Sequence, residues 1–308
     1  MEKKRNPKKQ ESTPVLETYH IPVLVTQVLE TLVTKPDGLY MDVTFGGGGH
    51  SQALLDTFPQ SHVVGLDWDK DAHENAVKLL EAYPDRLQVL FGSFAHLYKV
   101  IKKYNLENIQ GILADFGTSQ HQIHCKEGFS FTHDTPLDMR MSNSHFRVTA
   151  ATIIATASPE ELRHILWTYG EERHAKHIVN AIVEERKKRR IKTTRHLAEL
   201  IEKVIPRRGA KIHPATKTFQ ALRIVVNREL QNIESFLPAA FEALPAGGRL
   251  ACISFHSLED SLVKAFFAQK VQERKGRLVT KKALIADEQE RTTNPSSRSA
   301  KLRVIEKI

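Results

Sequence analysis

The chain has 308 residues, 41% hydrophobic and 26% charged, with a formal net charge of +9. This composition is that of a globular protein, which excludes a wholly disordered chain. No run of eighteen apolar residues occurs, which excludes a membrane-spanning helix. Cys125 and Cys252 lack the paired spacing of a zinc site, and the charged N-terminus lacks a secretory signal, so we expect a cytoplasmic protein without a bound metal.

The first half of the chain predicts a parallel sheet. Residues 1–18 are polar and basic and predict a disordered tail. Short β-branched runs follow and alternate with helical patterns, which we expect after His50, Asp69 and Phe94. The expected strands cover residues 39–45, 61–67, 87–91 and 111–115. Such an alternation is typical of an α/β fold with crossover helices.

The strand rhythm then stops, and helical patterns take its place. Ser158-Pro-Glu-Glu161 predicts a capped helix start, and a second helix begins near Thr194. A long third helix is expected from about Pro214 to Leu244. Strand patterns return at 249–255 and 302–307. We therefore expect a discontinuous core of residues 19–122 and 214–308, interrupted by an inserted helical domain of residues 123–213.

A glycine-rich turn after the first expected strand predicts a nucleoside cofactor. In Phe45-Gly-Gly-Gly-Gly-His50 the backbone can approach a ligand closely, and Asp67 at the end of the second strand can accept hydrogen bonds from ribose hydroxyls. The dinucleotide pattern needs a third glycine where Ser51 and Gln52 stand, and no P-loop occurs. S-adenosylmethionine fits what remains; a plain tight turn and a helix-capping Asp67 are the alternatives.

The sequence Asp115-Phe-Gly-Thr-Ser119 ends the fourth expected strand, opposite the cofactor. Asp115 is positioned to accept a hydrogen bond from a substrate amine or from the amino group of the cofactor, and both roles stay open. An amine conjugated with a ring is a poor nucleophile, so catalysis on such a substrate would depend on orientation and on an acceptor for its N–H groups.

A basic block predicts a polyanionic partner. Between Arg186 and Lys217 there are twelve Lys or Arg residues against two Glu, while the rest of the chain is nearly neutral. Lys and Arg that neutralise phosphates release condensed counterions, which favours RNA. The candidate RNA-binding residues are Arg186, Lys187, Lys188, Arg189, Arg190 and Arg223. A solvated helix end, and an ordinary ion pair for Arg223, are the alternatives.

Six longer motifs resemble those of the RsmH (MraW) family of ribosomal RNA small-subunit cytosine methyltransferases. They are Thr44-Phe-Gly-Gly-Gly-Gly-His-Ser51, Gly128-Phe-Ser-Phe131, Pro136-Leu-Asp-Met-Arg-Met141, Tyr169-Gly-Glu-Glu-Arg173, His213-Pro-Ala-Thr-Lys-Thr-Phe-Gln-Ala-Leu-Arg223 and Ile253-Ser-Phe-His-Ser-Leu-Glu-Asp260. The resemblance implies a Rossmann-like class I methyltransferase that methylates the N4 amine of a cytidine in 16S ribosomal RNA. It also implies a cofactor site lined by Gly48, Gly49, His50, Asp67, Phe94, Asp115 and Gln122.

Other polar groups leave alternatives open. Asp138 and Arg140 either line the pocket of the flipped cytosine, with Asp138 as a second catalytic candidate beside Asp115, or form a structural ion pair. His256-x-x-Glu259 has metal-ligand spacing but no third ligand nearby, so a base-contacting or structural role is expected. A non-catalytic RNA-binding module, a methyltransferase acting on another RNA and a nicotinamide-dependent oxidoreductase are the competing functions. A ribosomal particle is the expected setting, and a homodimer stays open.

Overall fold

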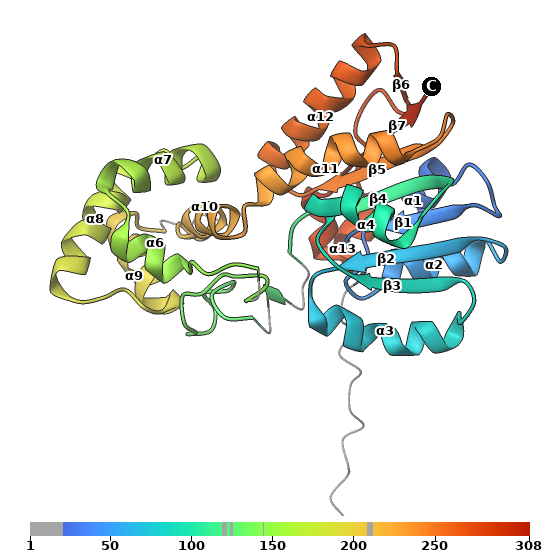
Figure 1. Ribbon diagram of the computed structural model, residues 1–308. Helices are drawn as coiled ribbons and strands as arrows, with labels where there is room; N and C mark the ends of the chain where they lie inside the picture. Colours follow the sequence, from blue (N-terminus) through green and yellow to red (C-terminus); the bar gives the residue numbers. More distant parts are fainter. Residues whose placement is uncertain (1–20, 119–121, 124–125, 144, 208–211) are drawn as a thin grey trace, which may run out of the picture.

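The computed structural model describes residues 21–118, 122–123, 126–143, 145–207 and 212–308, so the expected tail lies outside it. A seven-stranded sheet forms the right half of Figure 1, with the order β3-β2-β1-β4-β5-β7-β6. Its strands are β1 (Leu39–Asp42), β2 (His62–Asp67), β3 (Leu87–Phe91), β4 (Ile109–Asp115), β5 (Arg249–Ser254), β6 (Gly276–Leu278) and β7 (Lys301–Lys307). Strands β1 to β5 are parallel, and β7 runs antiparallel to β5 and β6. The predicted α/β fold is confirmed.

Helices cover both faces of the sheet with separate apolar layers. One layer contains side chains of α1 (Val25–Leu32), α2 (Gly49–Thr57) and α3 (Lys70–Ala82). The other contains side chains of α4 (Leu97–Tyr104), α11 (Glu229–Ala243) and α12 (Ser257–Gln272). The strands are buried on both sides, which is why they appear in the sequence as continuous apolar runs. Short elements complete the core: η1 (Phe94–His96), α13 (Glu288–Thr293) and η2 (Pro295–Ser299).

A helical insertion projects sideways from the sheet (Figure 1). It contains α6 (Ala150–Thr156), α7 (Pro159–Gly170), α8 (Ala175–Lys188) and α9 (Thr194–Val204), which pack around an apolar cluster of their own. The predicted capping box at Ser158 is confirmed, since its hydroxyl accepts the N–H of Glu161 and the Glu161 carboxylate accepts the N–H of Ser158. Among the residues described, no helix has the length and apolar character needed to cross a membrane.

The prediction of one long helix from Pro214 is wrong, because the helix is interrupted at Arg228. Two helices replace it, α10 (Thr216–Asn227) and α11, and Arg228 between them has a left-handed backbone with φ of 51°. Phe219 and Leu222 of α10 pack in the cluster of the insertion, whereas Ile233 and Phe236 of α11 pack against the sheet. We propose Arg228 as the boundary between the two cores in place of residue 213.

Candidate active site

A cavity opens at the carboxyl ends of the parallel strands, where α/β folds bind their ligands. It encloses about 1010 Å³, counting its open mouth. We call it the cofactor pocket. The residues that line it include Thr44, Phe45, Gly46, Gly49, His50, Asp67, Trp68, Asp69, Ser93, Phe94, Asp115, Phe116, Gly117, Thr118, Gln122, Met141, Glu229, Asn232, Phe255 and Glu259. Six of the seven expected cofactor residues are thus brought together around one space.

Gly48 is the exception. Its N–H donates to the carbonyl of Phe45 at 2.7 Å, and a Cβ at Gly48 would lie 2.5 Å from Leu79 and 2.6 Å from the Phe45 ring. The residue therefore supports the turn from behind, with φ of 74°, and does not line the pocket. Gly46 faces the pocket instead, and the sequence alone did not distinguish among four consecutive glycines.

Asp67 fixes the glycine turn against the end of β2. Its carboxylate accepts the N–H groups of Gly46 and Asp69, each at 2.8 Å. Burial raises the pKa of Asp67 to about 6, and the two backbone hydrogen bonds oppose that rise. Each carboxylate oxygen keeps a second lone pair for a ligand hydroxyl.

His50 and Gln122 line the pocket and also fasten neighbouring segments. His50 Nε2 lies 2.8 Å from the carbonyl oxygen of Val23, and burial lowers the pKa of the imidazole, so it stays neutral. The Gln122 amide donates to Asp69 Oδ2 at 3.1 Å, and Lys126 lies 2.7 Å from the same oxygen. Asp69 was missed in the sequence, although it follows Asp67 by only two residues.

Aromatic rings close one side of the pocket. Phe94 packs against Phe116 and Phe236 at centroid distances of 5.9 and 5.5 Å, and against Trp68 at 6.2 Å. Trp68 also meets Phe146, from the loop of the insertion, edge-on at 5.4 Å. The insertion is thereby attached to the wall of the cofactor pocket, and Trp68 is a lining residue that sequence reasoning missed.

Asp115 lies at the end of β4, and its backbone N–H donates to the hydroxyl of Thr44 at 2.7 Å. Burial, and then the negative charges of Asp42 and Glu259, raise the pKa of Asp115 well above its usual value. A pocket that contains several such carboxylates favours a cationic ligand, because a positive charge restores their ionised forms.

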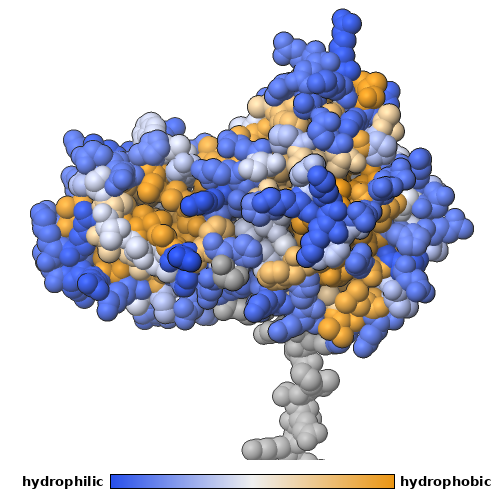
Figure 2. All heavy atoms as spheres, in the orientation of Figure 1, coloured by the Kyte–Doolittle hydropathy of each residue, from blue (hydrophilic) through white to orange (hydrophobic). Residues whose placement is uncertain are grey.

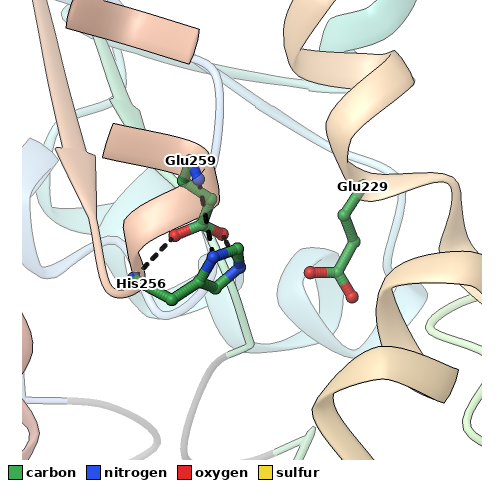
Figure 3. A group of neighbouring side chains, drawn as sticks. All are labelled: Glu229, His256 and Glu259. Atoms are coloured by element: carbon green, nitrogen blue, oxygen red, sulfur yellow. Dashed lines mark hydrogen bonds and ion pairs between the residues drawn. The ribbon is translucent and has the colours of Figure 1, made fainter. Parts of the chain in front are cut away.

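Glu229, at the start of α11, lies opposite His256 and Glu259, which contact each other at the start of α12 (Figure 3). Their potential ligand atoms lie within 4.8 Å of one another, so the expectation that no third ligand is near His256 and Glu259 is wrong. The break at Arg228 brings Glu229 there. Each carboxylate already has a cationic or polar partner, however, since Arg223 binds Glu229 and His256 Nε2 lies 3.2 Å from Glu259 Oε1.

The two carboxyl groups, Glu229 and Glu259, have pKa values shifted in opposite directions. Burial raises the pKa of Glu229, although Arg223 opposes the rise. Burial acts on Glu259 in the same sense, but hydrogen bonds and charge from His256 outweigh it and lower the pKa of Glu259. Glu259 also accepts the N–H of Phe255 at 2.8 Å and forms a capping box with His256 at the start of α12. The structural interpretation of His256 and Glu259 thus has direct support.

Asp138 does not line the cofactor pocket. It faces an adjacent hollow, where Arg140 binds both of its carboxylate oxygens at 2.6 and 2.7 Å. Arg140 also donates to the carbonyl of Phe146 at 3.2 Å. The pair holds the loop that presents Met141 to the pocket, which favours the structural alternative for Asp138.

The five candidate RNA-binding residues at the end of α8, Arg186 to Arg190, differ in their contacts. Arg186 donates to the carbonyls of Ile154 and Ala157 at the end of α6, at 3.1 and 2.7 Å. Lys187 and Arg189 form ion pairs with glutamates of α8, and their side chains are exposed, as are those of Lys188 and Arg190. The connection between α8 and α9 lies at the end of the insertion remote from the sheet, where Figure 2 shows mostly hydrophilic side chains.

Arg223 is placed apart from that block. It lies at the junction of α10 and α11, where Nε and Nη2 each bind Glu229 at 2.9 Å and Nη1 donates to Thr118 at 3.3 Å. The ion-pair alternative for Arg223 therefore describes its contacts, although the pair is mostly buried and adjoins the cofactor pocket.

Comparison with known proteins gives consistent matches along nearly the whole chain. The MraW methylase family matches residues 17–308. A protein named ribosomal RNA small subunit methyltransferase H from Coprothermobacter proteolyticus is 44% identical over 292 residues, covering 94% of this chain and 96% of its own. A protein of the same name from Heliobacterium modesticaldum is 43% identical, with coverage of 94% and 99%. A solved structure described as a putative ribosomal RNA methylase from Clostridium thermocellum shares 14% identity and a TM-score of 0.44, covering 92% of this chain and 95% of that one.

Proposed function

The chain belongs to the MraW methylase family, and we propose that it transfers a methyl group from S-adenosylmethionine to the N4 amine of a specific cytidine in small-subunit ribosomal RNA. The observation that carries this proposal is the cofactor pocket with its carboxylates, which adjoins the helical insertion. The curated relatives, which share more than 40% identity over almost the full length, are named as small-subunit ribosomal RNA methyltransferases.

The pocket has the features that S-adenosylmethionine requires. Asp67 offers oxygens to the two ribose hydroxyls, Phe94 offers an apolar wall to the adenine, and the Gly46–Gly49 turn admits close backbone approach. The sulfonium and the ammonium of the cofactor are both cationic, which suits a pocket that contains Asp115 and Glu259.

The chemistry at the pocket is a direct transfer. The lone pair of N4 attacks the methyl carbon, the sulfur–carbon bond breaks with its electrons left on sulfur, and S-adenosylhomocysteine departs. The positive charge then lies on N4, which releases one proton to a carboxylate or to water. Asp115, at the end of β4, is the residue that we place at this centre, either holding the amino group of the cofactor or accepting from N4. We give Asp138 no part in the transfer, because it faces the adjacent hollow.

An RNA substrate agrees with the charge distribution. Lys188 and Arg190 are exposed on the insertion, far along it from the sheet, and would bind phosphates some distance from the reacting base. A base in structured RNA reaches the cofactor only when it is unstacked, and the contacts of a pocket must offset that cost. We also propose that the RNA is methylated within a small-subunit particle.

Two alternative functions are less well supported. A non-catalytic RNA-binding protein would have no need of a pocket in which Asp67 and Asp115 have raised pKa values and Glu259 is fully buried, all at an energetic cost. A nicotinamide-dependent oxidoreductase would leave the basic residues of the insertion without a role.

The direct test is nucleoside analysis of small-subunit ribosomal RNA from cells with and without this protein. We expect N4-methylcytidine to disappear when the protein is removed and to return when the wild-type chain is supplied. An unchanged content of N4-methylcytidine would contradict the proposal, and the loss of another methylated nucleoside would identify a different target.

A further inference from the structure

A second cavity adjoins the cofactor pocket at the junction of the insertion and the sheet. The insertion contributes Phe129, Phe131 and Phe219, together with Arg223 from α10. Gly117, Thr118 and Phe255 line both cavities. We call this shared boundary the seam. A group bound in the second cavity would therefore lie next to a cofactor bound in the first.

The wall of the second cavity is aromatic and held in place. The rings of Phe131 and Phe219 meet edge-on with centroids 5.0 Å apart, and His213 packs on Phe131 at 4.7 Å. Aromatic side chains of this kind stack on unpaired bases in RNA-binding proteins. The aromatic composition of the wall thus suits a nucleobase.

An ion pair between Arg223 and Glu229 and a contact between His256 and Glu259 both cross the seam, and in each the carboxylate lies on the cofactor side. Glu229 lines the cofactor pocket and its partner Arg223 lines the second cavity, with two hydrogen bonds of 2.9 Å between them. Glu259 likewise lines the cofactor pocket, while His256, 3.2 Å away, lines the second cavity. The acceptors thus lie on the cofactor side, and the donors lie on the other side.

That polarity matches one edge of cytosine. Along its Watson–Crick edge, cytosine has a donor at N4 and acceptors at N3 and O2, whereas uracil has an acceptor at O4 and a donor at N3. A flipped base is commonly recognised through this edge together with stacking. With N4 directed at the seam, the amine of cytosine faces a carboxylate, and N3 and O2 face a guanidinium. Uracil in the same position would bring O4 toward the carboxylate, and two acceptors cannot form a hydrogen bond with each other.

We propose that the second cavity holds the target nucleobase and that the Arg223–Glu229 pair selects cytosine over uracil, with Glu229 accepting from N4 and Arg223 donating to N3 and O2. The inference rests on the proposed function and adds the residues that recognise the base. It also gives Arg223 a place in RNA recognition that is separate from the phosphate-binding residues of the insertion.

The test measures base selectivity and does not depend on turnover. Cytidine 5′-monophosphate and uridine 5′-monophosphate are titrated separately into the full chain saturated with S-adenosylhomocysteine, and binding is followed by saturation-transfer NMR. We expect the wild type to bind the cytidine nucleotide about tenfold more tightly, as one well-formed set of base contacts provides. Phe131→Leu should weaken both nucleotides alike, because it removes stacking.

Glu229→Gln is the decisive variant. An amide can donate to O4 of uracil, so the preference for the cytidine nucleotide should fall toward one, with the uridine nucleotide bound as well as before or better. Arg223→Lys keeps the charge but removes the bidentate hydrogen bonding, so it should also lower the ratio of cytidine to uridine nucleotide affinity. This variant provides the test if Glu229→Gln does not fold. The matched control is Glu306→Gln, which removes a similar carboxylate, paired with Arg249 at 2.9 Å at the opposite end of β5. Its ratio should stay that of the wild type.

Equal binding of the two nucleotides by the wild type, no binding of either, or an unchanged ratio in both seam variants would overturn the inference. These results are distinguishable from failure of the proposed function. Selectivity for cytidine without N4-methylcytidine in ribosomal RNA would refute the reaction alone, and N4-methylcytidine without selectivity at this pair would refute the assignment of the pair alone.

Discussion

Burial raises the pKa of individual carboxyl groups in and near the cofactor pocket, and this makes binding and stability depend on pH. Asp67 and Asp42 both have a pKa raised to about 6, with burial as the main cause. The first lines the cofactor pocket, whereas the second lies behind it, where Oδ2 accepts from Ser51 at 2.8 Å. The two residues therefore predict different pH effects, one on ligand binding and one on folding.

For Asp67 we expect cofactor affinity to depend on pH. The ionised carboxylate can accept from both ribose hydroxyls while it keeps the N–H groups of Gly46 and Asp69, so the affinity for S-adenosylhomocysteine should be level above about pH 6 and fall below it. Asp67→Asn should cost roughly 1.5 to 3 kcal/mol of binding at pH 7.5 and flatten the profile. Calorimetry at pH 5, 6 and 7.5 decides the matter. An equally steep profile in the variant would show that another group titrates.

For Asp42 we expect the opposite kind of effect, on stability. Its pKa is raised from 3.8 to about 6 in the folded protein, so the native state binds a proton more readily than the unfolded chain, and stability falls as pH rises from about 4 through 6. Asp42→Asn removes this cost and keeps an acceptor for the N–H of Thr44. It should raise the free energy of unfolding at pH 8 by up to about 3 kcal/mol, the free energy that corresponds to this rise in pKa.

Urea unfolding at pH 8 and pH 4 is the measurement for Asp42→Asn. The gain should be present at pH 8 and largely absent at pH 4, because the wild-type carboxyl is then protonated in the native state. A variant that is less stable than the wild type at pH 8 would show that the charge of Asp42 is needed where it lies.

At the scale of secondary-structure elements, the break between α10 and α11 brings Glu229 to the site. Arg228 has a left-handed backbone, which costs a residue with a Cβ about 1 to 2 kcal/mol. Arg228→Gly should therefore raise the free energy of unfolding by up to about 1 kcal/mol after the greater chain entropy of glycine is counted. Thermal and urea unfolding of the variant provide the measurement, and a loss of stability would mean that side-chain contacts of Arg228 outweigh the backbone cost.

The end of α8 leads to a second prediction at this scale. Replacing Lys187, Lys188, Arg189 and Arg190 together with Gln should weaken RNA binding and reduce its log–log salt slope by about 0.7 to 0.9 for each phosphate that is no longer neutralised. Arg186 is the contrasting position, because it binds the carbonyls that end α6. Arg186→Gln should lower stability and leave the slope nearly unchanged. Equal salt slopes in the wild type and the fourfold variant would make these residues a solvated surface.

At the scale of the whole molecule, the sequence predicts the sheet better than the contacts between the sheet and the insertion. Parallel strands buried on both faces are recognisable as apolar runs, and Asp67 and Asp115 can be placed because ligands bind where such strands end. Asp69, next to the predicted Asp67, could have been found from that rule. Phe94 and Gln122 followed from family resemblance and not from the pattern.

The junction between the sheet and the insertion depends on tertiary contacts that no local sequence pattern encodes. Nothing marks Arg228 as a left-handed residue, since arginine rarely adopts that conformation, and the apolar spacing of α10 continues in phase into α11. The contact of Trp68 with Phe146 and the ion pair of Arg223 with Glu229 likewise form only when the insertion packs against the sheet. The second cavity exists because of this packing, and therefore no sequence pattern predicts it.

The proposed reaction can be tested on the purified chain, which we expect to methylate N4 of cytidine in small-subunit ribosomal RNA. The most direct measurement incubates the full chain with S-adenosylmethionine labelled in its methyl group and with small-subunit particles or naked ribosomal RNA that lack the modification, and then digests the RNA to nucleosides for mass spectrometry. We expect label in N4-methylcytidine, and much less of it from Asp67→Asn when the S-adenosylmethionine concentration lies below the raised dissociation constant of that variant. Label found only in another nucleoside, or no label from either substrate despite measured binding of S-adenosylmethionine, would contradict it.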